Sequence, residues 1–77
     1  MKLLKIKWID HTTFTNAAWR DRKFVEKELT PIHITTVGWL LKETEDYYLL
    51  ASTKSDDSSM KHEFLILKGT VKKVKEL

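Results

Sequence analysis

The segment TTVGWLLKETEDYYLLAST, residues 35–53, constrains the fold most strongly, because its two apolar groups are separated by polar residues. In a helix, the consecutive polar residues 42–45 would lie around the whole circumference, and Asp46 would widen the break, so no apolar stripe would remain. The Tyr-Tyr pair and the Val-Gly-Trp cluster favour extended chain instead. The segment therefore predicts a hairpin of two strands, 32–43 and 47–53, joined by a short acidic turn.

Two details of this hairpin bear on the rest of the fold. A glycine inside a strand is typical of a bulge or a sharp bend, so Gly38 predicts a corner of the kind that a small barrel needs. The consecutive apolar residues 39–41 and 47–50 predict that both faces are covered, one by the barrel interior and the other by a helix or a neighbouring subunit. Adjacent strand residues face opposite sides, so one of Tyr47 and Tyr48 should offer its hydroxyl to a partner.

The N-terminal part of the chain predicts one strand and one short helix. Apolar residues alternate with lysines over residues 2–10, as in a half-buried strand. Residues 11–18 are polar and small, which predicts a loop, and Asp21 can cap a helix that ends before Pro31. We expect the apolar residues of this helix to face the sheet; they are Phe24, Val25 and Leu29.

The C-terminal part predicts two further strands. A solvated connection over residues 54–61 leads to a fourth strand, 63–67, then to a tight corner at Lys68-Gly69 and a fifth strand, 70–75. Residues 1–77 are thus predicted to form one domain of the mainly β (α+β) class. The expected architecture is a small, five-stranded, strongly bent barrel, SH3-like or Sm-like, with one short helix after the first strand.

Composition restricts the functional classes. A 77-residue chain without cysteine buries only about 60% of its unfolded surface and has no disulfide to brace it, so self-association into a homo-oligomer is expected. The longest apolar run, residues 47–51, is far too short to span a membrane, and the lysines that alternate near the N-terminus do not suit a signal peptide. An intracellular protein is therefore expected, and its net charge of +3 is mildly basic.

The sequence shows no set of residues for catalysis. None of the histidines, His11, His33 and His62, lies in a nucleophile motif or has the spacing of a metal site. The two glycines are isolated, so no phosphate-cradling loop is expected. We therefore predict neither an enzyme nor a metal or cofactor site.

Aromatic residues are more numerous than a small core can hold. Trp8, Trp39 and Phe24 belong to apolar-patterned elements and are expected in the core. Trp19 and Phe14 flank a polar loop, which makes them candidates for stacking on a ligand, together with one of the two tyrosines at positions 47 and 48.

Lysines are the second candidate feature. Lys68, Lys72 and Lys73 lie on the last corner and strand, where they are candidates for binding phosphates. If the first and last strands pair, they join Lys5, Lys7 and Lys75 in one basic patch. The alternative is that these lysines only protect strand edges from aggregation.

A pattern of spaced residues covers nearly the whole chain. The pattern is Trp8-x-Asp10, Trp19, Val37-Gly38-x-Leu40, Glu43-Thr44-x-Asp46-Tyr47-x-x-Leu50-Ala51, Ile66-x-Lys68 and Val71-x-x-Val74-x-x-Leu77. It is similar to a family of short proteins encoded by tailed bacteriophages. The stretch from Ile66 to Val74 also resembles the last two strands of Sm-like barrels, which implies RNA binding.

These observations give three functional hypotheses. The first is a non-enzymatic phage accessory protein, in the cytoplasm of an infected bacterium, that sequesters an anionic nucleotide such as a cyclic-nucleotide defence signal. The second is an Sm- or SH3-like module that binds RNA or DNA. The third is a protein–protein module, either an inhibitor of a host protein or a part of virion assembly.

Overall fold

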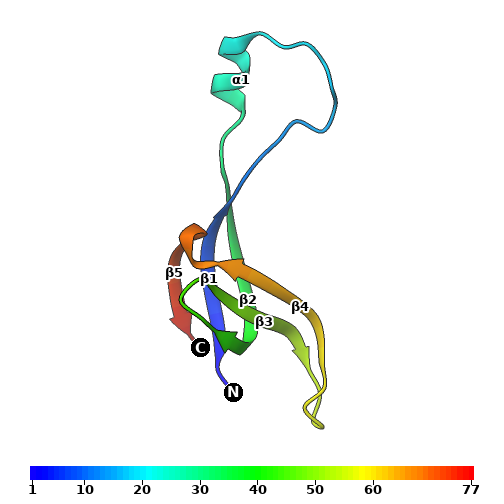
Figure 1. The fold of residues 1–77 in the computed structure, drawn as a ribbon, viewed down its shortest axis with the longest axis vertical. Coiled ribbons are helices and arrows are strands. Elements are labelled where there is room, and N and C mark those ends of the chain that lie inside the picture. The colour runs from blue at the N-terminus through cyan, green and yellow to red at the C-terminus, as the bar shows by residue number, and fades with distance from the viewer.

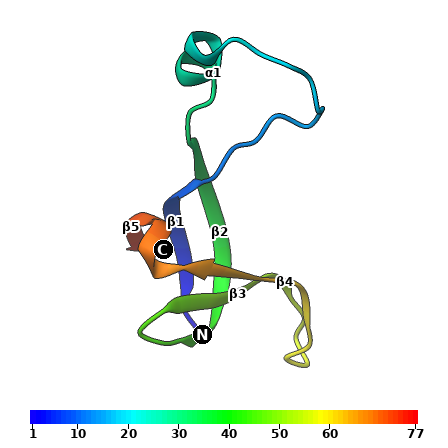
Figure 2. The same cartoon turned by 45° about the horizontal axis from the view of Figure 1, so that its top comes forward.

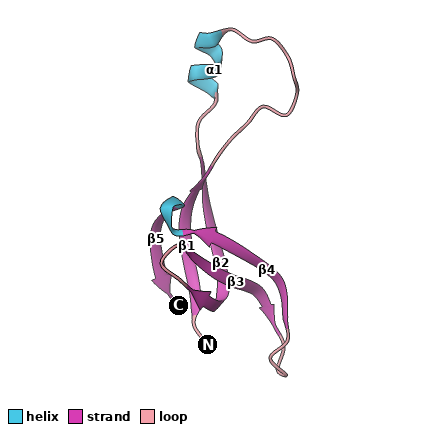
Figure 3. Ribbon diagram, in the orientation of Figure 1, coloured by secondary structure: helices cyan, strands magenta, loops and turns pink.

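A computed structural model describes all of residues 1–77 (Figures 1 and 3). Its elements are, in chain order, β1 (Leu3–Asp10), α1 (Arg22–Glu28), β2 (Ile32–Glu43), β3 (Tyr47–Lys54), β4 (Met60–Leu67), the 3₁₀ turn η1 (Lys68–Thr70) and β5 (Val71–Glu76). The mainly β class, the five strands and the short helix after the first strand are confirmed.

The five strands form one antiparallel sheet in the order β4-β3-β2-β1-β5. β4 and β5 are its edges, whereas β1 pairs with β2 on one side and with β5 on the other. The sheet is strongly bent, and in Figure 2 β3 and β4 run across the direction of β1 and β2. The last strand therefore lies beside the first.

The core lies inside this bend. Leu4 and Ile6 of β1, Leu50 of β3 and Ile66 of β4 form one buried cluster. Ile6 and Leu50 are completely inaccessible to solvent. Strands from distant positions in the sheet thus share one core. Burial of each such side chain contributes about 1.5–3 kcal/mol to the free energy of unfolding.

The 35–53 segment is a hairpin, as predicted, and Thr44 makes its turn. The Thr44 hydroxyl accepts hydrogen bonds from the backbone N–H groups of Asp46 and Tyr47, both at 3.1 Å. The Thr44 N–H in turn donates to the Tyr47 carbonyl at 3.0 Å. A threonine side chain thus closes the turn without an Asn-Gly pair.

Gly38 has a different role from the predicted corner. Its pairing with Leu4 is regular, and the register shift of β2 lies further along the strand, between Leu40 and Lys42. A Cβ at position 38 would lie 3.0 Å from Phe64 Cζ and 3.1 Å from Leu50 Cβ. Gly38 therefore leaves room for the opposite side of the bent sheet, which passes directly over it.

The connection between β3 and β4 is a short ordered turn. Ser59 N–H donates to Asp57 Oδ1 at 2.9 Å, and the Ser55 hydroxyl donates to the same oxygen. These hydrogen bonds, chiefly the one from Ser55, lower the pKa of Asp57 to about 2. Because the turn is this tight, β4 begins at Met60, three residues earlier than predicted.

The expectation that the helix packs on the sheet is wrong. No residue of α1 is buried, and Figure 1 shows the helix and its loop standing away from the strands. We call residues 11–31 the arm. Phe24, expected in the core, is 49% exposed and stacks on Phe14 within the arm, with 6.1 Å between the ring centroids. The arm thus packs on itself, since the segments on either side of α1 hold it away from the core.

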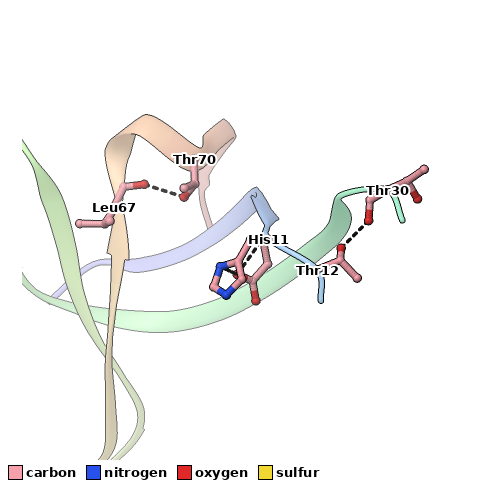
Figure 4. Close-up of polar contacts among 6 residues, drawn as sticks. His11, Thr12, Thr30, Leu67 and Thr70 are labelled. Atoms are coloured by element: carbon pink, nitrogen blue, oxygen red, sulfur yellow. Dashed lines mark hydrogen bonds and ion pairs between the residues drawn. The ribbon is translucent and has the colours of Figure 1, made fainter. Parts of the chain in front are cut away.

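The arm has its own polar contacts. Asp21 caps α1 by accepting from the Phe24 N–H at 3.4 Å, as predicted. At its base the Thr12 hydroxyl donates to the Thr30 carbonyl, which holds the two segments together (Figure 4). The radius of gyration is 16.3 Å, whereas a compact chain of this length has about 11–12 Å. The arm accounts for the elongated shape.

Trp8 and Trp39, which were also expected in the core, lie on opposite faces of the sheet. Trp8 packs against the core cluster, and its indole N–H donates to the Thr36 hydroxyl at 2.9 Å. Trp39 pairs with Leu3 and lies on the opposite face of the sheet, where the Lys54 ammonium is 5.3 Å from its ring centroid. The prediction for Trp39 is therefore wrong, because it follows Gly38 and the strand alternation turns it outward.

Substitution of Gly38→Ala should destabilise the protein by about 1–3 kcal/mol, because the new methyl group overpacks the space beside Phe64 and Leu50. Urea unfolding measures the change. Gly69→Ala is the matched control, since no atom lies within 4 Å of its added Cβ, and it should stay within about 0.5 kcal/mol of the wild type. Equal effects of both substitutions would contradict this role for Gly38.

Candidate functional site

A group of lysines lies on the outer face of β1 and β5, opposite the core. Strand alternation buries Leu4 and Ile6 and turns Lys5 and Lys7 outward. The antiparallel register sets Lys75 directly across from Lys5, and Lys73 directly across from Lys7. These four side chains alone line a hollow of about 150 Å³.

A bulge extends this group by one residue. The register of β1 with β5 shifts between Lys7 and Trp8, where Lys72 is the extra residue of β5. Lys72 and Lys7 line a second hollow of about 330 Å³; its other lining residues are Trp8, His33, Ile34 and Thr35. The two hollows share Lys7, so they form one continuous surface. We call Lys5, Lys7, Lys72, Lys73 and Lys75 the lysine face.

The lysine face carries uncompensated positive charge. The three ion pairs of the protein involve other residues, so no carboxylate oxygen lies within 4.0 Å of any of these five ammonium groups. Side chains directly opposite in an antiparallel pair have Cβ atoms about 4.5–5.5 Å apart, and like charges there are destabilising. The two lysine pairs thus cost stability in the free protein and suit a multiply charged anion.

The position of β1 bears on one of the two predicted roles of these lysines, the protection of a strand edge. Protection of an edge explains lysines on β5, which is an edge strand. It does not explain Lys5 and Lys7, because β1 is paired on both sides and has no free edge to protect. Edge protection therefore accounts for the lysines of β5 alone.

Lys68 lies outside the lysine face. Its ammonium donates to Glu43 Oε2 at 2.7 Å and lies 4.9 Å from the centroid of the Tyr48 ring. The hydrogen bond with Glu43 is the main cause that raises the pKa of Lys68. Of the three lysines chosen from the sequence, the structure brings together Lys72 and Lys73 and places Lys68 with an acidic partner.

The candidate stacking residues lie away from the lysine face. Trp19 is fully exposed on the arm. Phe14 stacks on Phe24, and the Arg20 guanidinium carbon lies 4.1 Å from the centroid of the Phe14 ring. Tyr47 and Tyr48 are on β3 and face opposite sides, with Tyr48 packed against the core. None of these four rings lines either hollow.

His33 and Thr35 are lining residues that sequence reasoning did not choose. Both follow from register, since Thr35 is directly across from Lys7 and His33 is across from Ile9. Neither carries a motif of its own. Only the pairing of the first two strands, once known, places them beside the lysines.

The rest of the molecule offers no metal site. No group of three or more His, Cys, Asp or Glu side chains lies close enough to hold a metal ion. His11 is near only Asp10, with 3.3 Å between Nδ1 and Oδ1, at the start of the arm (Figure 4). No helix has both the length and the apolar character that crossing a membrane requires.

Comparison with known proteins returned no similar family model, curated protein or solved structure. The lysine face therefore has to be interpreted from its own geometry.

Substitution of Lys75→Thr should raise the free energy of unfolding by about 0.2–1 kcal/mol at low ionic strength, because it removes the charge that faces Lys5. At about 1 M salt, where the Debye length is about 3 Å, the gain should shrink. Lys61→Thr is the control, since Lys61 faces Thr53. Urea unfolding at both salt concentrations measures the difference. The same salt-dependent gain in both variants would show that repulsion between the paired lysines is not its cause.

Proposed function

We propose that this protein is a non-enzymatic binding module that holds an anionic nucleotide by its phosphates on the lysine face. The observation that carries the proposal is the pairing of Lys5 with Lys75 and of Lys7 with Lys73 on a sheet face where β1 has no edge. A bound phosphate relieves the repulsion between these ammonium groups, so binding and folding favour each other.

The chemistry of the face selects a ligand with more than one negative charge. A single carboxylate neutralises one lysine, whereas a phosphate-bearing ligand spans the two rows of ammonium groups. Lysine acts on phosphate as a point charge without a fixed geometry, which suits capture better than the orientation of a reacting group. In the second hollow, His33 and the Thr35 hydroxyl supply hydrogen-bonding groups for a sugar or a base.

The biological setting of the proposal comes from the resemblance to tailed-phage proteins. A small protein that binds nucleotides without transforming them acts by sequestration. We therefore place it in the cytoplasm of an infected bacterium as a sponge for a nucleotide signal of host defence, such as a cyclic nucleotide.

A second candidate is binding of an RNA or DNA strand. The observation that favours it is the extent of the lysine face, which continues along β1 and β5 from Lys5 and Lys75 to Lys72. Backbone binding of this kind reads no sequence and weakens steeply with added salt. Length dependence separates the candidates, because a nucleotide site saturates with one small ligand whereas a strand gains affinity with each phosphate it adds.

Titration with cyclic mono- and dinucleotides, and with single-stranded RNA and DNA of about ten nucleotides, tests the proposal by calorimetry. The double variant Lys7→Gln/Lys73→Gln should lose affinity about tenfold or more, which corresponds to at least about 1.4 kcal/mol. Lys68→Gln is the matched control and should bind like the wild type, because Lys68 already has Glu43 as its partner.

Two results would contradict the proposal. The first is no binding of any member of the panel at low salt. The second is equal affinity in the wild type and in the double variant, which would place the ligand away from the lysine face.

A further inference from the structure

The chain exposes far more surface than a folded protein of its size. Its accessible surface is 6224 Å², whereas a compact monomer of 9.1 kDa exposes about 4,900 Å². The excess, about 1,300 Å², exceeds the roughly 800 Å² that each partner buries in a stable interface of standard size. The arm contributes to this excess, since it stands away from the sheet (Figure 1).

The tip of the arm is an apolar surface that nothing covers. Ala17, Ala18 and Trp19 line a hollow at the tip, and Trp19 is fully exposed to solvent. The ring of Phe24, on α1 of the same arm, is 49% exposed. An exposed indole on a segment ordered by its own contacts is typical of an interface anchor.

The second apolar surface is the outer face of the β3–β4 hairpin. Tyr47 is directly across from Leu67, and Leu49 from Leu65, whereas the residues between them face the core. Leu65 and Leu67 are 49% and 56% exposed. We call Tyr47, Leu49, Leu65 and Leu67 the leucine face. Apolar residues on both faces of a hairpin indicate that each face is covered, and here the outer face is covered only in part, since Tyr47 and Leu49 are half-buried and Leu65 and Leu67 are exposed.

We infer that the tip of the arm packs on the leucine face of a second copy of this chain, forming a dimer with two equivalent contacts. The arm does not contact the leucine face of its own chain, because Figures 1 and 2 both show it extending away from the strands. Two copies related by a two-fold axis can exchange arms and cover both surfaces at once. The excess area of each chain is sufficient for such an interface.

Charge complementarity supports this pairing. Lys23 and Lys27 are one turn apart on α1, and neither belongs to an ion pair. Glu45 and Asp46 immediately precede Tyr47 at the end of the leucine face, and they too have no ion-pair partner. A docked arm brings these opposite charges to the rim of the interface, where they steer association. The lysine face, on β1 and β5, takes no part.

Sedimentation velocity over about 5–200 µM tests the inference, because this range spans typical dissociation constants of small homodimers. The wild type should dimerise. Trp19→Ser on the arm and Leu65→Lys on the leucine face should each raise the dissociation constant about tenfold or more. Thr15→Ser and Leu77→Lys are the controls, since Thr15 lies on the same loop and Leu77, 57% exposed, is outside both surfaces.

Mixing the two monomeric variants provides the sharpest test. The Leu65→Lys copy has an intact arm and the Trp19→Ser copy has an intact leucine face, so the mixture should recover association through one contact. Circular dichroism verifies that both variants are folded.

A wild type that stays monomeric over the whole concentration range would overturn the inference. The arm would then bind a different protein or fold back on its own chain. Failure of the mixture to associate would overturn it as well. So would dimerisation of either variant alone, because a face-to-face dimer leaves Trp19→Ser dimeric and an arm-to-arm dimer leaves Leu65→Lys dimeric. Nucleotide binding by either variant bears only on the lysine face, so the two proposals fail separately.

Discussion

The pairing of β1 with β5 is the interaction on which the structure and its proposed function both depend. It brings the last strand of the chain back to the first, and β1 thereby becomes an interior strand. Because side chains alternate along a strand, the same eight residues supply Leu4 and Ile6 to the core and Lys5 and Lys7 to the opposite face. One register thus fixes the core and the charged surface together.

This coupling has an energetic consequence. A domain of 77 residues with a core cluster of four side chains has little stability to spare, yet it retains lysines directly opposite one another. Selection for folding alone favours a neutral or acidic residue at one position of each pair. Under the proposed function, an anion bound on the face offsets this repulsion, since ligand binding stabilises the folded state.

The sequence was most informative where the pattern had a period. Alternation in residues 2–10 and the polar break at 42–46 were sufficient to predict the strands and the hairpin. Gly38 was interpreted as a corner. A glycine inside a strand is expected both at a bend and where a distant strand passes closely, so the sequence alone does not separate the two. The apolar spacing of Phe24, Val25 and Leu29 predicted a helix packed on the sheet. The segments on either side of α1 hold it off the sheet, and their sequence has no periodic pattern that reveals this. The lysines were joined in one patch only on the condition that the first and last strands pair, and the structure meets this condition. Their exact register is a long-range property that no local pattern specifies.

Chemical-shift mapping of the amide groups during titration with inorganic pyrophosphate tests the central claim most directly. Pyrophosphate supplies the charge of the ligand without a base or sugar, so it reports on the lysine face alone. The account predicts the largest changes at Lys5, Lys7, Lys73 and Lys75, fading as salt is added. Changes confined to the arm or to the surroundings of Lys68, with β1 and β5 unaffected, would contradict it.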